Sequence, residues 1–205
     1  TNISLKSLIR KEFSLDNLQI STKKIKLRDI ILLARSFKNS PELFVLNKII
    51  KDGYLFADIN LNFDINGKIK NNYEIKGFIK NGKLDALNRI NLKNLNLYFK
   101  LTKKNYLFED INTEINGYEL LSTSLKIKEK NNLFIVSGKV FTDEKNNYLK
   151  LLSEFNKSYL QNSNIKNIKI KSINNFSFDI NKKFKIKNLI IKSEIDLKNL
   201  EYKNN

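Results

Sequence analysis

The sequence lacks both cysteine and histidine, along with methionine and tryptophan. Without cysteine there is no disulfide frame and no thiol nucleophile or thiolate metal site, and without histidine there is no histidine-dependent triad or histidine-ligated zinc. Most enzyme classes lose their main catalytic groups. Since methionine is absent and the sequence starts at Thr1, we expect one domain of a larger protein, with any signal or anchor upstream.

Long hydrophobic runs are also missing. The longest are "IILLA" at 30–34 and "LFVL" at 43–46, far short of the roughly 18 residues that a membrane-spanning helix needs. We therefore expect this part of the chain to be soluble or to lie at a surface.

Arginine is scarce although the formal net charge is +17, because lysine supplies nearly all of the positive charge. Clustered positive charge would favour a nucleic acid or an anionic membrane as partner. An AT-rich genome drifts toward Lys and Asn codons. A solvated lysine surface that arises in this way explains the same composition. Both interpretations stay open at this point.

The carboxylates do not form a catalytic or metal-binding pattern. Asp58, Asp64, Glu74, Glu114 and Glu119 alternate with apolar residues, which is typical of the solvated face of a strand. The stretch 62–73 has the spacing of a calcium loop, but its twelfth position is a tyrosine where a bidentate glutamate is required. We expect no enzyme activity, no cofactor and no metal ion.

Alternating apolar and polar residues dominate what is present. In "GYLFADINLNFDINGK", 53–68, every second residue is apolar, which predicts a strand with one dry and one wet face. Further strands are predicted at 13–20, 54–65, 73–80, 90–101, 106–116, 120–128, 133–141, 148–155, 165–171, 176–181, 184–192 and 194–198. Helical spacing predicts a helix at 28–37 and a second one that starts at Ser40-Pro41 and is closed by Gly53.

Asn-Gly dipeptides at 66/67, 81/82 and 116/117 predict tight hairpin turns, because both residues tolerate positive φ. The predicted fold is mainly β: a large, twisted, mostly antiparallel sheet forming a curved groove, with a short helical pair near the N-terminus. Twelve strands at ~4.8 Å spacing span about 58 Å, whereas two helices cover about 20 Å. Either the sheet closes into a sandwich or barrel, or an apolar face stays open for a ligand or partner.

The candidate lining of this apolar face consists of the alternating apolar residues of the predicted strands. They are Leu55, Ala57, Ile59, Leu61, Phe63, Ile65, Ile75, Leu95, Leu97, Phe99, Leu101, Ile111, Ile115, Leu125, Ile127, Phe134, Val136, Phe176, Phe178, Ile180 and Ile186.

Aromatic residues interleaved with lysines would suit single-stranded nucleic acid. In "NLNLYFKL", 94–101, the bulky apolar side chains and the lysine largely occupy opposite faces. That separation favours one dry face and one wet face over a platform for stacked bases.

The order of elements resembles the AsmA-like proteins of the Gram-negative envelope, YhdP-type members more than TamB. The resemblance is carried by "FSLDNLQISTKKIKL" (13–27), the helical pair "RDIILLARSF" to "KDG" (28–53), "YLFADINLNF", and the hairpins through "NNLFIVSGKVF" to residue 141, with "FKIKNLIIKSEIDLKNL" (184–200) matching more loosely. It implies a bridge-like lipid transfer protein, anchored in the inner membrane and projecting into the periplasm as a β-groove for phospholipids.

We therefore expect 1–205 to be a single β-rich segment, with leading strands at 1–27, the helical pair at 28–52 and the antiparallel sheet at 53–205. Its expected function is phospholipid transport between inner and outer membrane, in support of outer-membrane integrity. The expected partners are phospholipids, the inner membrane and envelope proteins, with no nucleic acid. One alternative is a non-enzymatic envelope assembly module that binds proteins, and another is a basic nucleic-acid-binding protein.

Overall fold

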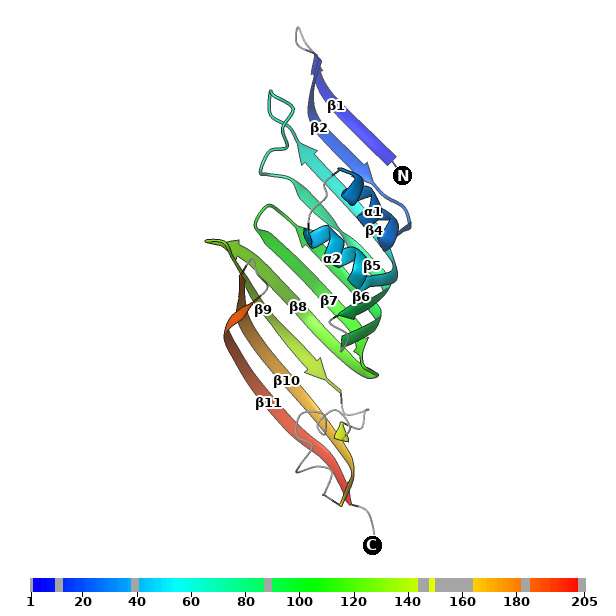
Figure 1. Ribbon diagram of the computed structural model, residues 1–205, viewed down its shortest axis with the longest axis vertical. Helices are drawn as coiled ribbons and strands as arrows, with labels where there is room; N and C mark the ends of the chain where they lie inside the picture. Colours follow the sequence, from blue (N-terminus) through cyan, green and yellow to red (C-terminus); the bar gives the residue numbers. More distant parts are fainter. Residues whose placement is uncertain are drawn as a thin grey trace.

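The computed structural model describes residues 2–9, 13–37, 41–86, 90–143, 148–149, 164–181 and 185–202. These residues form one large antiparallel sheet and two short helices near the N-terminus, as the sequence predicts (Figure 1). The strands are β1 Asn2–Ile9, β2 Phe13–Ser21, β3 Ile25–Lys26, β4 Ile50–Asn62, β5 Glu74–Ala86, β6 Ile90–Leu101, β7 Asn105–Ile115, β8 Tyr118–Lys130, β9 Leu133–Thr142, β10 Ile165–Asn181 and β11 Ile186–Tyr202.

The strands follow one another in space almost in chain order, β1-β2-β4-β5-β6-β7-β8-β9-β10-β11, and short β3 pairs beside β4. Every pairing is antiparallel, and β1 and β11 do not meet, so the sheet is open. The alternative of a closed sandwich or barrel is therefore wrong for the described residues. A meander of hairpins adds one strand at a time to the same edge, which extends the sheet without closing it.

Two of the three predicted Asn-Gly turns are confirmed. Asn116 and Gly117, with φ of 51° and 92°, join β7 to β8 as a two-residue hairpin, the geometry of a type I′ turn. Asn66 and Gly67 lie in a turn between β4 and β5, where the Gly67 N–H donates to the Asp64 carbonyl at 3.0 Å.

The turn predicted at Asn81-Gly82 is wrong, because β5 continues through this dipeptide to Ala86. Asn81 has a φ of 53°, and the register of β5 against both neighbours shifts here, so the dipeptide forms a β-bulge. The Asn81 N–H donates to the Asn96 side-chain oxygen at 3.1 Å. Gly82 is buried and tightly packed, since an added Cβ would lie 3.1 Å from the Leu95 Cβ and would require that neighbour to shift.

The helical pair consists of α1, Leu27–Phe37, and α2, Pro41–Ile49. Leu27 and Ile31 lie one turn apart on α1 and are each only 7% exposed. The prediction that Gly53 closes the second helix is wrong, because the chain already enters β4 at Ile50. Gly53 has a φ of 126°, and an added Cβ would come within 2.8 Å of both Gly82 and Leu27, so this glycine allows α1 and β5 to approach β4 closely.

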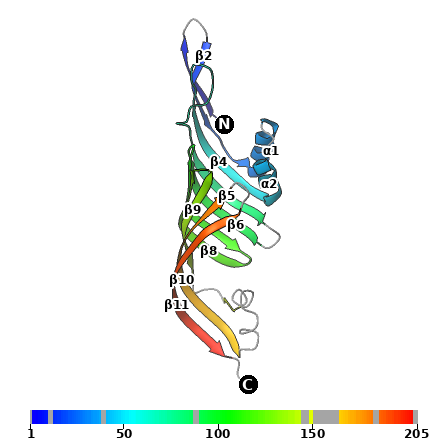
Figure 2. The same cartoon turned by 60° about the vertical axis from the view of Figure 1, so that its left-hand side comes forward.

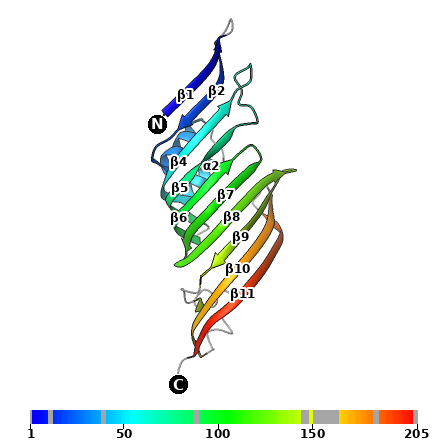
Figure 3. The same cartoon turned by 180° about the vertical axis from the view of Figure 1, so that it is seen from behind.

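The helices lie on one face of the sheet, against β4 and β5 (Figure 2), and the opposite face is free of helices when seen from behind (Figure 3). Neither helix has the length and apolar character needed to cross a membrane, within the ranges that are described. The strands curve toward the side that carries the helices, which gives the sheet a groove-like shape (Figure 2).

The C-terminal strands are longer than predicted. The segments 165–171 and 176–181 belong to one strand, β10. The segments predicted at 184–192 and 194–198 correspond to one strand, β11, which begins at Ile186. The strand predicted at 148–155 lies outside the described residues except for Tyr148 and Leu149, which are not in a strand. Tyr148 is 1% exposed, and its ring stacks on Tyr118 with centroids 5.6 Å apart.

Candidate functional site

Apolar side chains form continuous rows across the strands on the helix-bearing face of the sheet. Directly paired residues of an antiparallel sheet point to the same face, so the register shows which side chains are neighbours. One row crosses eight strands, from β2 to β10: Ile20, Ile59, Ile75, Leu101, Tyr106, Ile127, Val136 and Phe178.

A second row runs beside the first and reaches the last strand: Ala57, Gly77, Phe99, Phe108, Leu125, Gly138, Phe176 and Ile191. Its glycines sit beside aromatic residues. A Cβ on Gly138 would lie 2.8 Å from the Phe176 ring, so the missing side chain makes room for that ring. We call the surface formed by these two rows and their apolar neighbours the apolar face.

The apolar face is most deeply buried near the helices. Ala57, Leu95, Leu97 and Phe99 are each 5–9% exposed and form one cluster. Farther along the sheet, Val136 is 4% exposed, whereas its row neighbours Ile127 and Phe178 are only half-buried. The described helices contact β4 and β5 and leave the face of β7 to β11 uncovered by any described helix.

Most of the predicted lining residues lie on this face. Ile59, Ile75, Leu101, Ile127, Val136 and Phe178 are in the first row, and Ala57, Phe99, Leu125 and Phe176 are in the second. The neighbours that extend the rows along the strands are Leu55, Leu61, Leu95, Leu97, Phe134, Ile180 and Ile186.

Two predicted residues lie beyond the strand to which they were assigned, because β4 ends at Asn62 and not at Ile65. Phe63 forms an isolated bridge to Ile69, and Ile65 lies in the following turn with 78% of its surface exposed. Alternation continues in the sequence, but the Asp64 side chain stops the strand by accepting hydrogen bonds from the N–H groups of Asn66 and Lys68, both at 2.9 Å.

Two members of the rows, Tyr106 and Phe108 of β7, were not predicted from the sequence, and a bulge in this strand explains why. Asp110 has a φ of 49°, and the pairing of β6 with β7 shifts by one residue in its vicinity. Ile111 packs against the buried cluster, as Phe108 does, although one position is odd and the other even. Sequence reasoning followed the odd positions Ile111 and Ile115 and so missed Tyr106 and Phe108.

Tyr106 is the polar exception within the first row. It pairs with Leu101 on one side and Ile127 on the other, and this apolar burial raises the pKa of its phenol above the ordinary value. The Tyr106 side chain therefore stays neutral over the physiological pH range. The apolar face carries no ionised group at this position.

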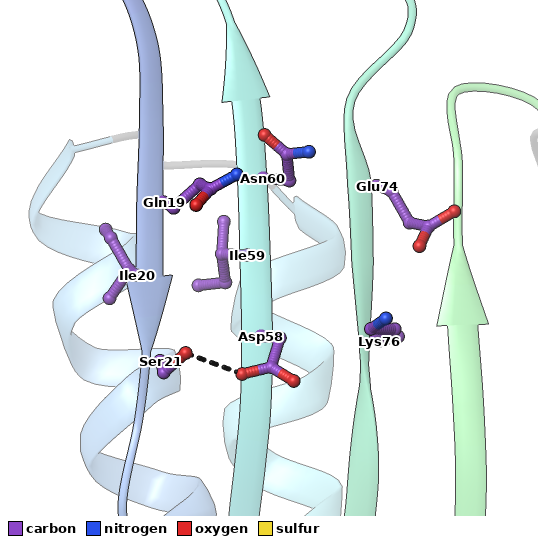
Figure 4. Close-up of a pocket in the computed structure, with 8 residues that line it drawn as sticks. All are labelled: Gln19, Ile20, Ser21, Asp58, Ile59, Asn60, Glu74 and Lys76. Carbon is purple, nitrogen blue, oxygen red and sulfur yellow. Dashed lines mark hydrogen bonds between the residues drawn. The ribbon is translucent and has the colours of Figure 1, made fainter. Parts of the chain in front are cut away.

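The opposite face, called the polar face, carries polar side chains together with some aromatic ones. A shallow hollow of about 280 Å³ lies between β2, β4 and β5, with the helices behind the sheet (Figure 4). In it the Ser21 hydroxyl donates to Asp58 at 2.7 Å. The hydrogen bond from Lys100, at 2.7 Å, lowers the pKa of Glu74. These carboxylates are bound in exposed pairs and do not form a shared acid–base site.

An aromatic ladder lies on this polar face. The rings of Phe56 and Phe78 stack with centroids 4.4 Å apart, and Phe78 contacts Tyr98 at 5.9 Å. Because Phe56 and Phe78 present their faces to each other, those faces are not available to stack on bases. The ladder stabilises strand pairing and does not favour the nucleic-acid alternative.

Metal ligands do not converge anywhere in the described ranges, where no group of three or more acidic side chains could hold an ion. Asp64 belongs to the stretch 62–73, which has the spacing of a calcium loop. Its carboxylate instead accepts hydrogen bonds from backbone N–H groups of its own turn.

Comparison of this chain with protein-family models, with curated proteins and with solved structures finds no match. The apolar face is therefore the feature of this chain that indicates a function most directly.

Proposed function

We propose that this chain is a segment of an AsmA-like envelope protein whose apolar face carries the acyl chains of phospholipids between the inner and outer membranes. The observation that supports this most is the continuity of the two apolar rows across the strands. The strands follow one another along the long axis of the molecule (Figure 1), and the rows cross them, so an acyl chain could move from strand to strand without leaving apolar surroundings.

The energetics favour a lipid over water on this face. Each methylene that leaves water gains ~0.8 kcal/mol. Ile127 and Phe178 are only half-buried in the described structure, so a ligand chain would add to their burial. Transport of this kind requires no catalytic residue, metal or cofactor. It would take place in the periplasm of a Gram-negative bacterium, with an inner-membrane anchor elsewhere in the protein.

The test uses two glutamate substitutions on neighbouring positions of β8. Ile127→Glu places a charge in the first apolar row, and Lys126→Glu places the same charge on the polar face of the same strand, where it faces Ser137 and Leu107. The wild type is purified without detergent and its bound phospholipid is measured by mass spectrometry. We expect Ile127→Glu to lose at least about four-fifths of that lipid, because a carboxylate in the acyl path must be desolvated.

The control Lys126→Glu should bind as much lipid as the wild type, and circular dichroism should show that both variants are folded. A wild-type chain that carries no phospholipid would refute the proposal. Full lipid occupancy in a folded Ile127→Glu variant would refute the assignment of the apolar face as the binding surface.

A further inference from the structure

Strand β11 has one edge paired with β10, and its other edge has no partner among the described strands. It is long, from Ile186 to Tyr202, and it exposes large apolar side chains: Ile186, Leu189, Ile190, Ile191, Ile195, Leu197 and Tyr202 are each 55–65% exposed. A long apolar edge strand is a template for another strand, and proteins usually shield such edges. The charged residues of β11 itself indicate which strand would pair with this edge.

The charges of β11 are arranged with opposite signs around its middle. Lys192 precedes Ser193 and Glu194 follows it, and both point to the polar face, since their neighbours Ile191 and Ile195 lie on the side of Phe176. Bulges flank this middle stretch at Asn188, where φ is 52°, and at Lys198, both equally far from Ser193 along the chain. Between them, Ile190 to Leu197 pairs regularly with β10.

We propose that β11 pairs antiparallel with β11 of a second copy of this chain, with the two-fold axis at Ser193. Residues at equal distances before and after Ser193 then face each other across the interface. Lys192 lies opposite Glu194 of the second copy, twice by symmetry. Ile191 lies opposite Ile195 of the second copy on the apolar side.

The two registers centred on the adjacent residues are disfavoured by the same charges. In an edge strand, every second residue directs its backbone N–H and C=O groups outward, and directly opposed residues of an antiparallel pair must be of the same kind. The two-fold axis of a symmetric pair therefore passes beside a residue and not between two residues. Centring on Lys192 would place it against Lys192 of the second copy, and centring on Glu194 would place two glutamates together. Like charges directly opposite each other destabilise strand pairing.

The pairing joins the two sheets with their apolar faces on the same side, because residues directly opposite in an antiparallel pair share a face. Ile191, at the end of the second row, would continue into Ile195 of the second copy. The proposal does not depend on lipid as the ligand, and it would stand if the lipid proposal failed.

The first test is sedimentation of the 205-residue chain at physiological salt, where the Debye length is about 8 Å and repulsion between two chains of charge +17 is screened. We expect a closed dimer. Lys192→Glu alone and Glu194→Lys alone should each weaken the dimer roughly ten- to thirtyfold, because both interface pairs become repulsive. Lys126→Glu, the same charge change on the central strand β8, should leave the dimer unchanged.

Mixing the two single variants separates an intermolecular effect from local damage to the strand. A chain with Lys192→Glu and a chain with Glu194→Lys have complementary charges at both pairs, so the mixture should dimerise as well as the wild type. A monomeric wild type, open polymers, or a mixture that remains monomeric would overturn the proposal.

Cysteine cross-linking tests the register without changing charge, and the chain has no cysteine of its own to interfere. Ser193→Cys should form a disulfide-linked dimer on mild oxidation, because Cα atoms directly opposite lie about 4.5–5.5 Å apart. Ile190→Cys should not, since its copies would be separated by six residues of strand, about 20 Å. Equal cross-linking at both positions, or at Ile190 alone, would overturn the register.

Discussion

At the scale of single residues, β6 carries both buried and exposed side chains, which contribute very differently to the free energy of unfolding. Leu97 on β6 is 9% exposed within the buried cluster of the apolar face, whereas Lys93 on the same strand is exposed. Burial of this degree next to Phe99 and Leu95 leaves little room for the surroundings to relax after a truncation.

We expect Leu97→Ala to lower the free energy of unfolding by about 2–4 kcal/mol, through lost burial and the cavity left behind. Lys93→Ala should change it by less than about 0.5 kcal/mol. Urea unfolding followed by circular dichroism measures both. Equal, small effects would contradict the assignment of Leu97 to the core.

The ion pair between Glu74 and Lys100 predicts a pH effect. The hydrogen bond from Lys100 lowers the folded-state pKa of Glu74, so its stabilising contribution is present above the unfolded-state pKa and is lost as the pH falls through the folded-state pKa. Because both side chains are at least a third exposed, the contribution is small, at most about 1 kcal/mol. We expect Lys100→Met to raise the pKa of Glu74.

Carbon-13 NMR titration of the Glu74 carboxyl group measures this shift. Lys76→Met is the matched control, because Lys76 affects Glu74 only through a weaker charge interaction. A larger shift in the control than in Lys100→Met would show that the hydrogen bond is not the main cause.

At the scale of elements, glycines determine how closely neighbouring strands approach. A Cβ on Gly77 would lie 2.0 Å from the carbonyl oxygen of Phe56 on β4, which is far inside van der Waals contact. Gly67 presents the opposite case: a Cβ there would meet nothing within 4 Å, but its φ of 74° is unfavourable for other residues.

We therefore expect Gly77→Ala to destabilise the protein by at least about 2–3 kcal/mol, since the clash is with backbone that cannot rotate away. Gly67→Ala should cost about 1 kcal/mol, from backbone strain alone. Thermal unfolding of the two variants ranks them. A greater loss for Gly67→Ala would contradict the close approach of β4 and β5.

At the scale of the whole molecule, the sheet behaves as a row of strands in which each contacts mainly its neighbours. The described helices add contacts mainly at β3, β4 and β5, near one end of the array. Stability in such an array is the sum of local terms and varies along its length.

Hydrogen exchange read by mass spectrometry should show this gradient. At concentrations where the chain is monomeric, we expect amides of β4 to β6 to exchange most slowly and those of the edge strand β11 to exchange fastest. Uniform exchange through one global opening would contradict it. At concentrations that favour the proposed dimer, β11 should become protected, while the exchange of β5 should not change.

The sequence by itself determined the class of fold and the chemistry that is absent. Alternation predicts a β sheet whatever the partners of each strand, and β6, Ile90–Leu101, lies where the pattern placed it. The Asn116-Gly117 hairpin follows from local backbone preferences in the same way. These features depend on residues close together in the chain.

Only the tertiary structure decided which apolar residues share a face and whether the face closes. The bulges near Asn81 and Asp110 insert one extra residue, which transfers every later side chain of the strand to the other face, and their positions depend on cross-strand pairing. The open edge of β11 likewise arises from the order of strands in space. Periodicity in one strand contains no information about its neighbours, so neither the continuous apolar rows nor the open edge could be derived from it.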